Sequence, residues 1–163
     1  MKNPTRTTGG PERQLLAYML DHTRTELIDT VRGLSETEAR RRLVPSMTTP
    51  IGLVKHAAFA DRKWFQHILG GLPESACDGA MVGEASFVVS DDETVADVIA
   101  EFERASSRAR TIAADFDLDA VRECPGFGTV SLRWIYLLMI QEFARHAGHS
   151  DILREQTDAN RRT

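Results

Sequence analysis

Four segments of the chain repeat apolar residues with the 3.6-residue period of an α-helix, and breaks rich in glycine and proline separate them. The segments span residues 11–32, 50–69, 90–115 and 130–155. A helix that is apolar on one side is stable when that side packs against other helices. Because no strand pattern of consequence lies between the segments, the sequence predicts an all-α four-helix bundle.

Single residues mark the ends of several of these helices. Pro11 suits the first turn of the first helix, and Gly33 ends it. Thr49 followed by Pro50 predicts an N-cap and a first turn for the second helix. Ser131 is the predicted N-cap of the fourth.

Two capping boxes predict further helix starts. Ser35 with Glu38 opens a short connecting helix, to about residue 43, between the first and second long helices. Ser90 with Glu93 predicts the start of the third long helix.

Residues 73–89 are expected to form a long loop with a short extended piece at 87–89. A loop of this length suits a lid or rim over a site, and it also suits a simple crossover between antiparallel helices, which we favour. A glycine turn is predicted at residues 126–128.

The composition suits one domain. The chain has 163 residues, of which 42% are hydrophobic and 27% are charged, enough for one core of good size. We predict a single helical domain at residues 11–158, with a disordered N-terminal tail at 1–10 and a short tail at 159–163.

Charge and hydropathy argue against several classes of protein. The net charge of −4, without a basic helix face, gives no reason to expect nucleic acid, and the three arginines at 40–42 are expected to be solvated. The N-terminus has no signal-peptide core, and no apolar run is long enough to span a membrane. Cys77 and Cys124 are isolated, which favours free thiols in a cytoplasmic protein.

The fourth segment carries polar chemistry on its apolar face. At about 100° per residue, Glu142, His146 and His149 fall in the same arc as the apolar side chains. A buried carboxylate needs a cation, a donor or a metal beside it. This spacing lets neighbouring turns share one metal ion, and it also suits a Glu–His hydrogen bond that only fixes the core. The spacing leaves both interpretations open.

A third metal ligand would have to come from another helix. His22 and His67 lack a partner at metal spacing and are expected to be surface or boundary residues. His56 lies in an apolar helix with Gly52 and Ala60 one turn before and after it. These small neighbours are expected to leave room for an ion or a substrate, so His56 is the candidate.

Four stretches carry a family resemblance: GLVKHAAFADRKWF, QEFARHAGHSDILRE, the pair Pro45 and Ser46, and SLRW at residues 131–134. Together they resemble the DinB-like (YfiT-like) superfamily of four-helix metalloproteins, over about residues 13–158. The closest branch is the one labelled mini-circle protein. Relatives include metal-dependent hydrolases with three histidine ligands and thiol-dependent enzymes such as the mycothiol-dependent maleylpyruvate isomerase.

The resemblance implies metal ligands at His56, Glu142 and His146, with His149 as a supporting residue or an optional fourth ligand. A glutamate in this set resembles the isomerase more than the three-histidine proteins. Where many close relatives have a histidine one turn before the glutamate, this chain has Leu138. A divalent ion, zinc or nickel, suits such ligands.

The resemblance also implies an activity, in which the ion holds a low-molecular-weight thiol, mycothiol or similar, for S-transfer to or isomerisation of a small-molecule substrate. A metal-dependent hydrolase, a metal-binding protein without turnover and a structural bundle are the alternatives. Arg133 or Arg145 could orient an anionic substrate, although surface ion pairs are their more ordinary role. We expect a homodimer, formed through the third helix or around Trp64 and Trp134.

Overall fold

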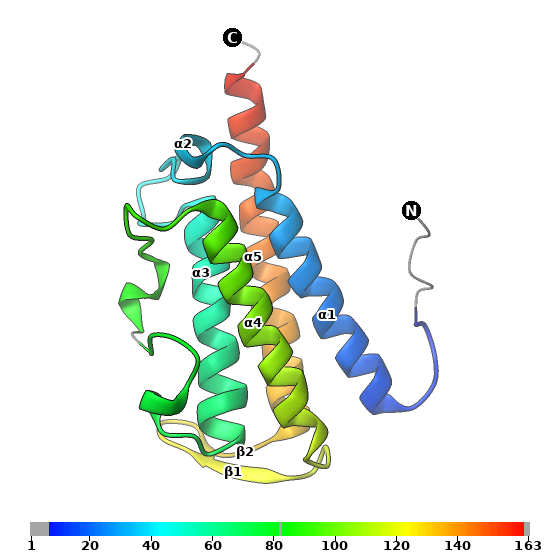
Figure 1. The fold of residues 1–163 in the computed structure, drawn as a ribbon. Helices are drawn as coiled ribbons and strands as arrows, with labels where there is room; N and C mark the ends of the chain where they lie inside the picture. Colours follow the sequence, from blue (N-terminus) through cyan, green and yellow to red (C-terminus); the bar gives the residue numbers. More distant parts are fainter. Residues whose placement is uncertain (1–6, 82, 162–163) are drawn as a thin grey trace.

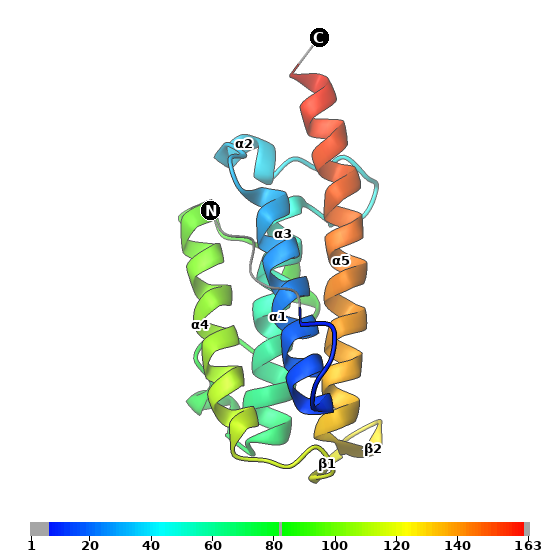
Figure 2. The ribbon, with the colours of Figure 1, turned by 90° about the vertical axis from the view of Figure 1, so that its right-hand side faces the viewer.

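The computed structural model describes residues 7–81 and 83–161, and its four long helices lie side by side as a bundle (Figure 1 and Figure 2). They are α1 (Glu12–Val31), α3 (Pro50–Asp61), α4 (Val95–Ala114) and α5 (Leu132–Asn160). α5 packs mainly on α1 and α3 mainly on α4, while α3 also contacts α5 and α1. The prediction of an all-α bundle is confirmed.

The core lies between the apolar faces of these helices. Phe65, Phe102, Phe143 and Ile135 are almost completely buried there. Each side chain of this size contributes about 1.5–3 kcal/mol when it is removed from water. The predicted apolar stripes therefore form the observed core, although Met19, which belongs to the stripe of the first helix, is 42% exposed.

A buried ion pair joins three of the helices. Asp61 of α3 accepts hydrogen bonds from Arg24 of α1 at 2.6 and 3.1 Å and from Ser106 of α4 at 2.8 Å. Burial acts to lower the pKa of Arg24, but the carboxylates of Asp61 and Asp21 together outweigh burial and keep that pKa above its ordinary value. The network pairs the buried charges and fixes α1 and α4 against α3.

The predicted caps of α3 and α5 are confirmed. Thr49 Oγ1 accepts a hydrogen bond from the backbone N–H of Gly52 at 3.1 Å, and Pro50 occupies the first turn. Ser131 Oγ accepts one from the N–H of Trp134 at 3.1 Å.

The short connecting helix α2 (Glu36–Ala39) is also confirmed, with Ser35 and Glu38 as its capping box. It ends earlier than predicted, at Ala39. The guanidinium of Arg40 donates hydrogen bonds to the carbonyl oxygens of Val89 and Ser90 at 3.2 and 3.0 Å. The expectation that this arginine is merely solvated is therefore wrong, because it fixes α2 to the segment that precedes α4.

The predicted start of the third long helix is wrong by several residues. Ser90 donates its N–H and hydroxyl to Glu93 at 2.9 Å, but this box closes a turn that precedes the helix. α4 starts after a second box, in which Thr94 caps the N–H of Asp97. The later start places Val98 in the first turn, facing the core.

An antiparallel hairpin that was not predicted closes one end of the bundle, with strands β1 (Val121–Cys124) and β2 (Gly128–Ser131). Val130, expected in the fourth helix, lies in β2. The predicted glycine turn is confirmed, because Gly126 has a φ of 83°, in the left-handed region. Each strand has four residues, too few for an alternating pattern to stand out in the sequence.

α3 continues directly into a π-helix, η1 (Arg62–Leu69), which ends at the predicted glycine break. The N–H of Gly70 bonds to the carbonyl of Phe65 at 3.0 Å, one residue wider than in an α-helix. The wide turn buries three consecutive side chains, Trp64, Phe65 and Gln66.

We call residues 73–89 the covering loop; its described parts, 73–81 and 83–89, run along α3 on the outside of the bundle (Figure 1). The loop contains two 3₁₀ turns, η2 (Glu74–Ala76) and η3 (Glu84–Phe87). The extended piece predicted at residues 87–89 is confirmed only in part. Phe87 is the last residue of η3, and the backbone of Val88 after it is extended.

The predicted tails lie partly outside the described residues, at 1–6 and 162–163. Residues 7–10 form neither helix nor strand, and α5 continues beyond the predicted domain end to Asn160. The last turns of α5 extend past the other helices (Figure 1). In the described part of the chain, no helix is both long and apolar enough to cross a membrane.

Candidate metal centre

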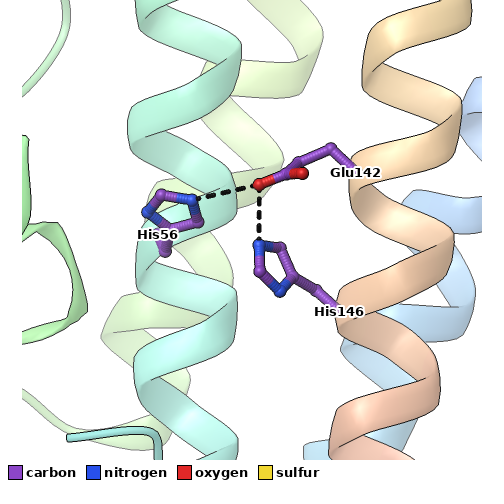
Figure 3. Close-up of side chains that lie close together, drawn as sticks. All are labelled: His56, Glu142 and His146. Atoms are coloured by element: carbon purple, nitrogen blue, oxygen red, sulfur yellow. Dashed lines mark hydrogen bonds and ion pairs between the residues drawn. The ribbon is translucent and has the colours of Figure 1, made fainter.

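His56, Glu142 and His146 meet where α3 faces α5 (Figure 3). His146 Nε2 lies 2.9 Å from Glu142 Oε1, and His56 Nε2 lies 3.6 Å from the same oxygen. One nitrogen or oxygen of each side chain lies within 4.8 Å of the others. Helical spacing places the Glu142 and His146 side chains on adjacent turns of one face of α5, and helix packing brings His56 to them.

The covering loop holds the other side of the His56 ring. Ser86 Oγ lies 2.7 Å from His56 Nδ1, and the ring of Phe87 stacks on the imidazole with centroids 4.0 Å apart and planes 8° from parallel. The loop therefore does more than cross between helices, and it forms a rim on His56. Sequence reasoning missed both loop residues, and its only signal for them was the length of the loop.

Gly52 lets the loop approach. A Cβ atom at Gly52 would lie 2.7 Å from the carbonyl oxygen of Phe87. The space that this small residue was expected to leave for an ion or a substrate is thus taken by loop backbone.

The hydrogen bonds of Ser86 assign the tautomer of His56. The Ser86 hydroxyl donates its single hydrogen to the carbonyl of Gly83, so its oxygen accepts from His56 Nδ1–H. The neutral ring then presents an unprotonated Nε2 to Glu142.

The carboxylate of Glu142 is strongly held in its charged form. Hydrogen bonding from His146 is the largest cause, and it lowers the pKa of Glu142 far below its usual range despite partial burial. An ionised oxygen therefore faces the lone pair of His56 Nε2 at 3.6 Å. Two acceptors facing each other repel unless a proton or a metal ion lies between them.

The geometry fits a divalent ion. Bonds of about 2.0–2.2 Å separate neighbouring ligands of a tetrahedral ion by about 3.3–3.6 Å, close to the His56–Glu142 spacing. The His146–Glu142 pair would open by a few tenths of an ångström. His146 Nδ1 is buried without a hydrogen-bond partner in the described part, so Glu142 is the polar group that positions this ring. Two imidazoles and one carboxylate leave coordination positions open, as in catalytic zinc sites.

His149 lies beside this cluster and not within it. Its ring centroid is 6.0 Å from that of His146, and the side chain is exposed. It lines a shallow cavity of about 280 Å³ with residues of the α2–α3 connection, including Ser46. Its role as an optional ligand stays a prediction.

The remaining histidines lie apart from the cluster, although the expectation that His22 lacks a partner one helical turn away is wrong. His22 pairs with Glu26 at 3.3 Å, and His67 Nδ1 lies 2.7 Å from the carbonyl oxygen of Leu72. Leu138, one turn before the cluster on α5, is partly buried and packs against the core.

Arg133 forms surface ion pairs, the more ordinary of the two roles expected for it. It bonds Glu12 at 2.9 Å and also contacts Asp119. Nine residues before Glu142, it starts about 13 Å away along the helix axis, at the hairpin end of the bundle.

With this geometry established, comparison with known families becomes informative. The model of one family, mycothiol-S-transferase, matches residues 15–159. The chain belongs to this family. The mycothiol-S-transferases are members of the DinB-like superfamily, so the resemblance seen in the sequence is confirmed. No curated protein matches the chain.

Proposed function

We propose that the protein is a divalent-metal-dependent S-transferase that joins mycothiol, or a similar low-molecular-weight thiol, to a small electrophile. The observation that carries the proposal is the meeting of His56 Nε2, presented without a proton, with the ionised Glu142 and with His146. The family supplies the thiol class. A bound divalent cation lowers the pKa of a thiol and keeps it as the nucleophilic thiolate.

The side chains have distinct tasks in this proposal. His56, Glu142 and His146 hold zinc or nickel, and His149 acts at the edge of the site as a support or optional ligand. Ser86 keeps the lone pair of His56 on the metal side. Phe87 covers one face of that ring and excludes water from it.

The nucleophilic sulfur comes from the thiol substrate and not from the protein. Cys77 and Cys124 are both free. Burial raises the pKa of the Cys77 thiol, which makes the reactive thiolate scarce at neutral pH. Neither cysteine belongs to the His56 cluster.

The first experiment is the metal content of the purified protein by elemental mass spectrometry. About one zinc or nickel ion per chain is expected, with loss of the ion in His56→Ala and His146→Ala. His22→Ala is the matched control and should keep the ion, because the His22 ring pairs with an exposed glutamate and stacks on Tyr18, away from the cluster. A protein that binds no ion after incubation with either metal is a structural bundle in which Glu142 and His146 are simply paired.

The second experiment separates an enzyme from a metal-binding protein without turnover. Mycothiol and chlorodinitrobenzene are mixed with the metal-loaded protein, and the thioether is measured by mass spectrometry. A carbon–sulfur bond forms, the carbon–chlorine bond breaks, and chloride and a proton leave to solvent. Product formation that fails in His56→Ala supports the transferase. Full metal binding without product, across several electrophiles, indicates a binding protein, and hydrolysis of added esters indicates the hydrolase.

We place this transferase in the cytoplasm as a homodimer that binds small molecules and neither nucleic acid nor membrane. The proposed dimer face surrounds Trp64 and Trp134, which pack with Phe127 of the hairpin at centroid distances of 5.4–5.7 Å. Phe127 is 56% exposed and adds apolar surface beside the two tryptophans. Sedimentation velocity at micromolar concentration should show a dimer that Phe127→Asp weakens, and a monomeric wild type would end the dimer proposal.

A further inference from the structure

Arg62, the first residue of η1, carries a buried positive charge with unused donors. It is 1% exposed, and its Nη2 donates to Glu101 of α4 at 2.6 Å. Its Nε and Nη1 are buried and have no hydrogen-bond partner within the described part of the chain. Burying such donors unpaired costs about 1–3 kcal/mol for each group, so the site is built to receive an acceptor.

A cavity of about 310 Å³ lies against this guanidinium, beneath the covering loop. Its walls are largely apolar, with Phe59 on α3 and Ala80, Ala85 and Val88 on the loop. One water takes about 30 Å³ in the liquid, so the cavity exceeds what bridging water needs and is in the range of small-ligand sites.

The neighbouring charges limit what the cavity can hold. Lys55 also lines it, but its ammonium is already paired with Glu93 and with Glu101, the latter at 3.0 Å. Both carboxylates are thus engaged, and the buried Nε and Nη1 of Arg62 are the donors beside the cavity that lack a partner in the described part of the chain. Lys55 and Arg62 are balanced by Glu93 and Glu101, so the cavity favours the single charge of a carboxylate group over the double charge of a phosphate group.

The loop is shaped around the guanidinium. A Cβ atom at Gly79 would lie 2.6 Å from Arg62 Nη1 and 2.7 Å from Cζ, so glycine lets the backbone cross at contact distance. The buried Gln66 holds the loop there, donating to the Asp78 carboxylate at 2.8 Å and accepting from its N–H at 3.1 Å.

The cavity adjoins the candidate metal centre. Ser86 lines it and also holds His56 Nδ1, and the Phe59 ring lies 5.9 Å from the His56 ring. We propose that Arg62 and this cavity form a binding site for the carboxylate of a small organic acid. That the acid is the electrophilic co-substrate rests on the proposed function, whereas the carboxylate site itself does not depend on a metal.

The test is calorimetric titration of the full chain with succinate, in which carboxylate groups are joined by an apolar chain, and with its neutral analogue succinamide. Succinate should bind and succinamide should not. Arg62→Gln should weaken succinate binding by about tenfold or more, because a charge-assisted hydrogen bond is lost. Arg104→Gln, at an exposed arginine of α4, is the matched control and should bind as the wild type does.

A second variant protects the test against misfolding of Arg62→Gln. Gly79→Ala keeps the charge but forces the loop or the guanidinium to move, and it should also weaken succinate binding. Circular dichroism verifies that each variant is folded. A folded wild type that binds no succinate, or folded variants at Gly79 and Arg62 that both bind it normally, would overturn the proposal. Sulfate binding as tightly as succinate would replace the carboxylate with an inorganic anion.

Titrations with and without added zinc separate the two proposals. Succinate binding that depends on Arg62 in a chain unable to bind metal would leave the carboxylate site standing and remove the transferase. A chain that binds metal and transfers the thiol but does not bind succinate would support the transferase and remove the carboxylate site.

Discussion

One hydroxyl hydrogen decides which nitrogen of His56 faces the cluster. Because the Ser86 hydroxyl donates that hydrogen to the Gly83 carbonyl, its oxygen can only accept a hydrogen bond from His56 Nδ1–H. Metal-binding histidines commonly have such a partner on the other ring nitrogen, and losing it weakens the site. The chemistry of a helix residue is thus set by a loop residue.

Ser86→Ala should therefore weaken zinc binding by about 10–100-fold, measured by competition with a chromogenic chelator. Ser107→Ala, at an exposed serine of α4, should leave the affinity unchanged. Unchanged affinity in a folded Ser86→Ala protein would mean that the hydroxyl does not orient the ring.

The depressed pKa of Glu142 gives a second prediction, for the metal-free protein held in a chelator. A carboxylate whose pKa is lower folded than unfolded stabilises the fold above its unfolded value, about 4.3, and this stabilisation is lost as the pH falls through the folded value. Between about pH 5 and pH 3, the wild type should lose free energy of unfolding relative to Glu142→Gln.

Urea unfolding across that pH range measures the difference. For Glu103→Gln, at an exposed glutamate of α4, the free energy of unfolding should change with pH much more nearly as it does in the wild type. If the difference in free energy of unfolding between the wild type and Glu142→Gln stayed constant with pH, the hydrogen bond from His146 would not depress the pKa of Glu142.

The sequence could predict the three clustered residues but not what surrounds them. Glu142 and His146 share a helical face by period alone, and His56 was the remaining imidazole in an apolar segment. Ser86 and Arg62 gave no such signal. Their roles depend on where an irregular loop docks, and no periodicity encodes that contact. Assignment of the cluster as a metal site stays a prediction.

At the scale of elements, the covering loop and α3 behave as one unit. The Phe87 carbonyl sits where a side chain at position 52 would be, and Ser86 and Phe87 both contact His56. The position of the loop therefore depends on a residue of the helix that it covers.

Gly52→Ala should push the loop outward and lower the free energy of unfolding by about 1–3 kcal/mol, although alanine is the better helix former. Gly148→Ala in α5 is the matched control, because a Cβ atom there meets nothing within 4 Å. It should raise stability by about 0.5–1 kcal/mol. Thermal and urea unfolding check both, and equal stabilisation by the two alanines would show that the loop is not packed on Gly52.

Long helices whose apolar residues repeat with the helical period were predicted well. Short elements, and a helix start with two possible capping boxes, were not. Thr49 and Ser131 marked true helix starts, since each stands alone before an apolar repeat. At α4, two successive capping boxes competed, and packing of Val98 favours the second. The hairpin and the π-turn of η1 depend on a few hydrogen bonds that leave no repeat to detect.

For the whole molecule, the Asp61–Arg24 pair is a buried polar link between α1 and α3, to which Ser106 of α4 also bonds. Asp61→Ala should lower the free energy of unfolding by about 3–5 kcal/mol, because it leaves the buried Arg24 charge unpaired. The double variant with Arg24→Met should recover part of that loss. Urea denaturation measures both, and a single-variant loss below about 1 kcal/mol would mean that water replaces the carboxylate.

This pair also bears on the order in which the chain assembles. Its partners are separated by 37 residues on one side and 45 on the other, so the bonds require three helices to be docked at once. Interactions that form late leave the folding rate almost unchanged when they are removed, and accelerate unfolding instead. The lifetime of the native state, more than the speed at which it is reached, is therefore what a single buried aspartate controls.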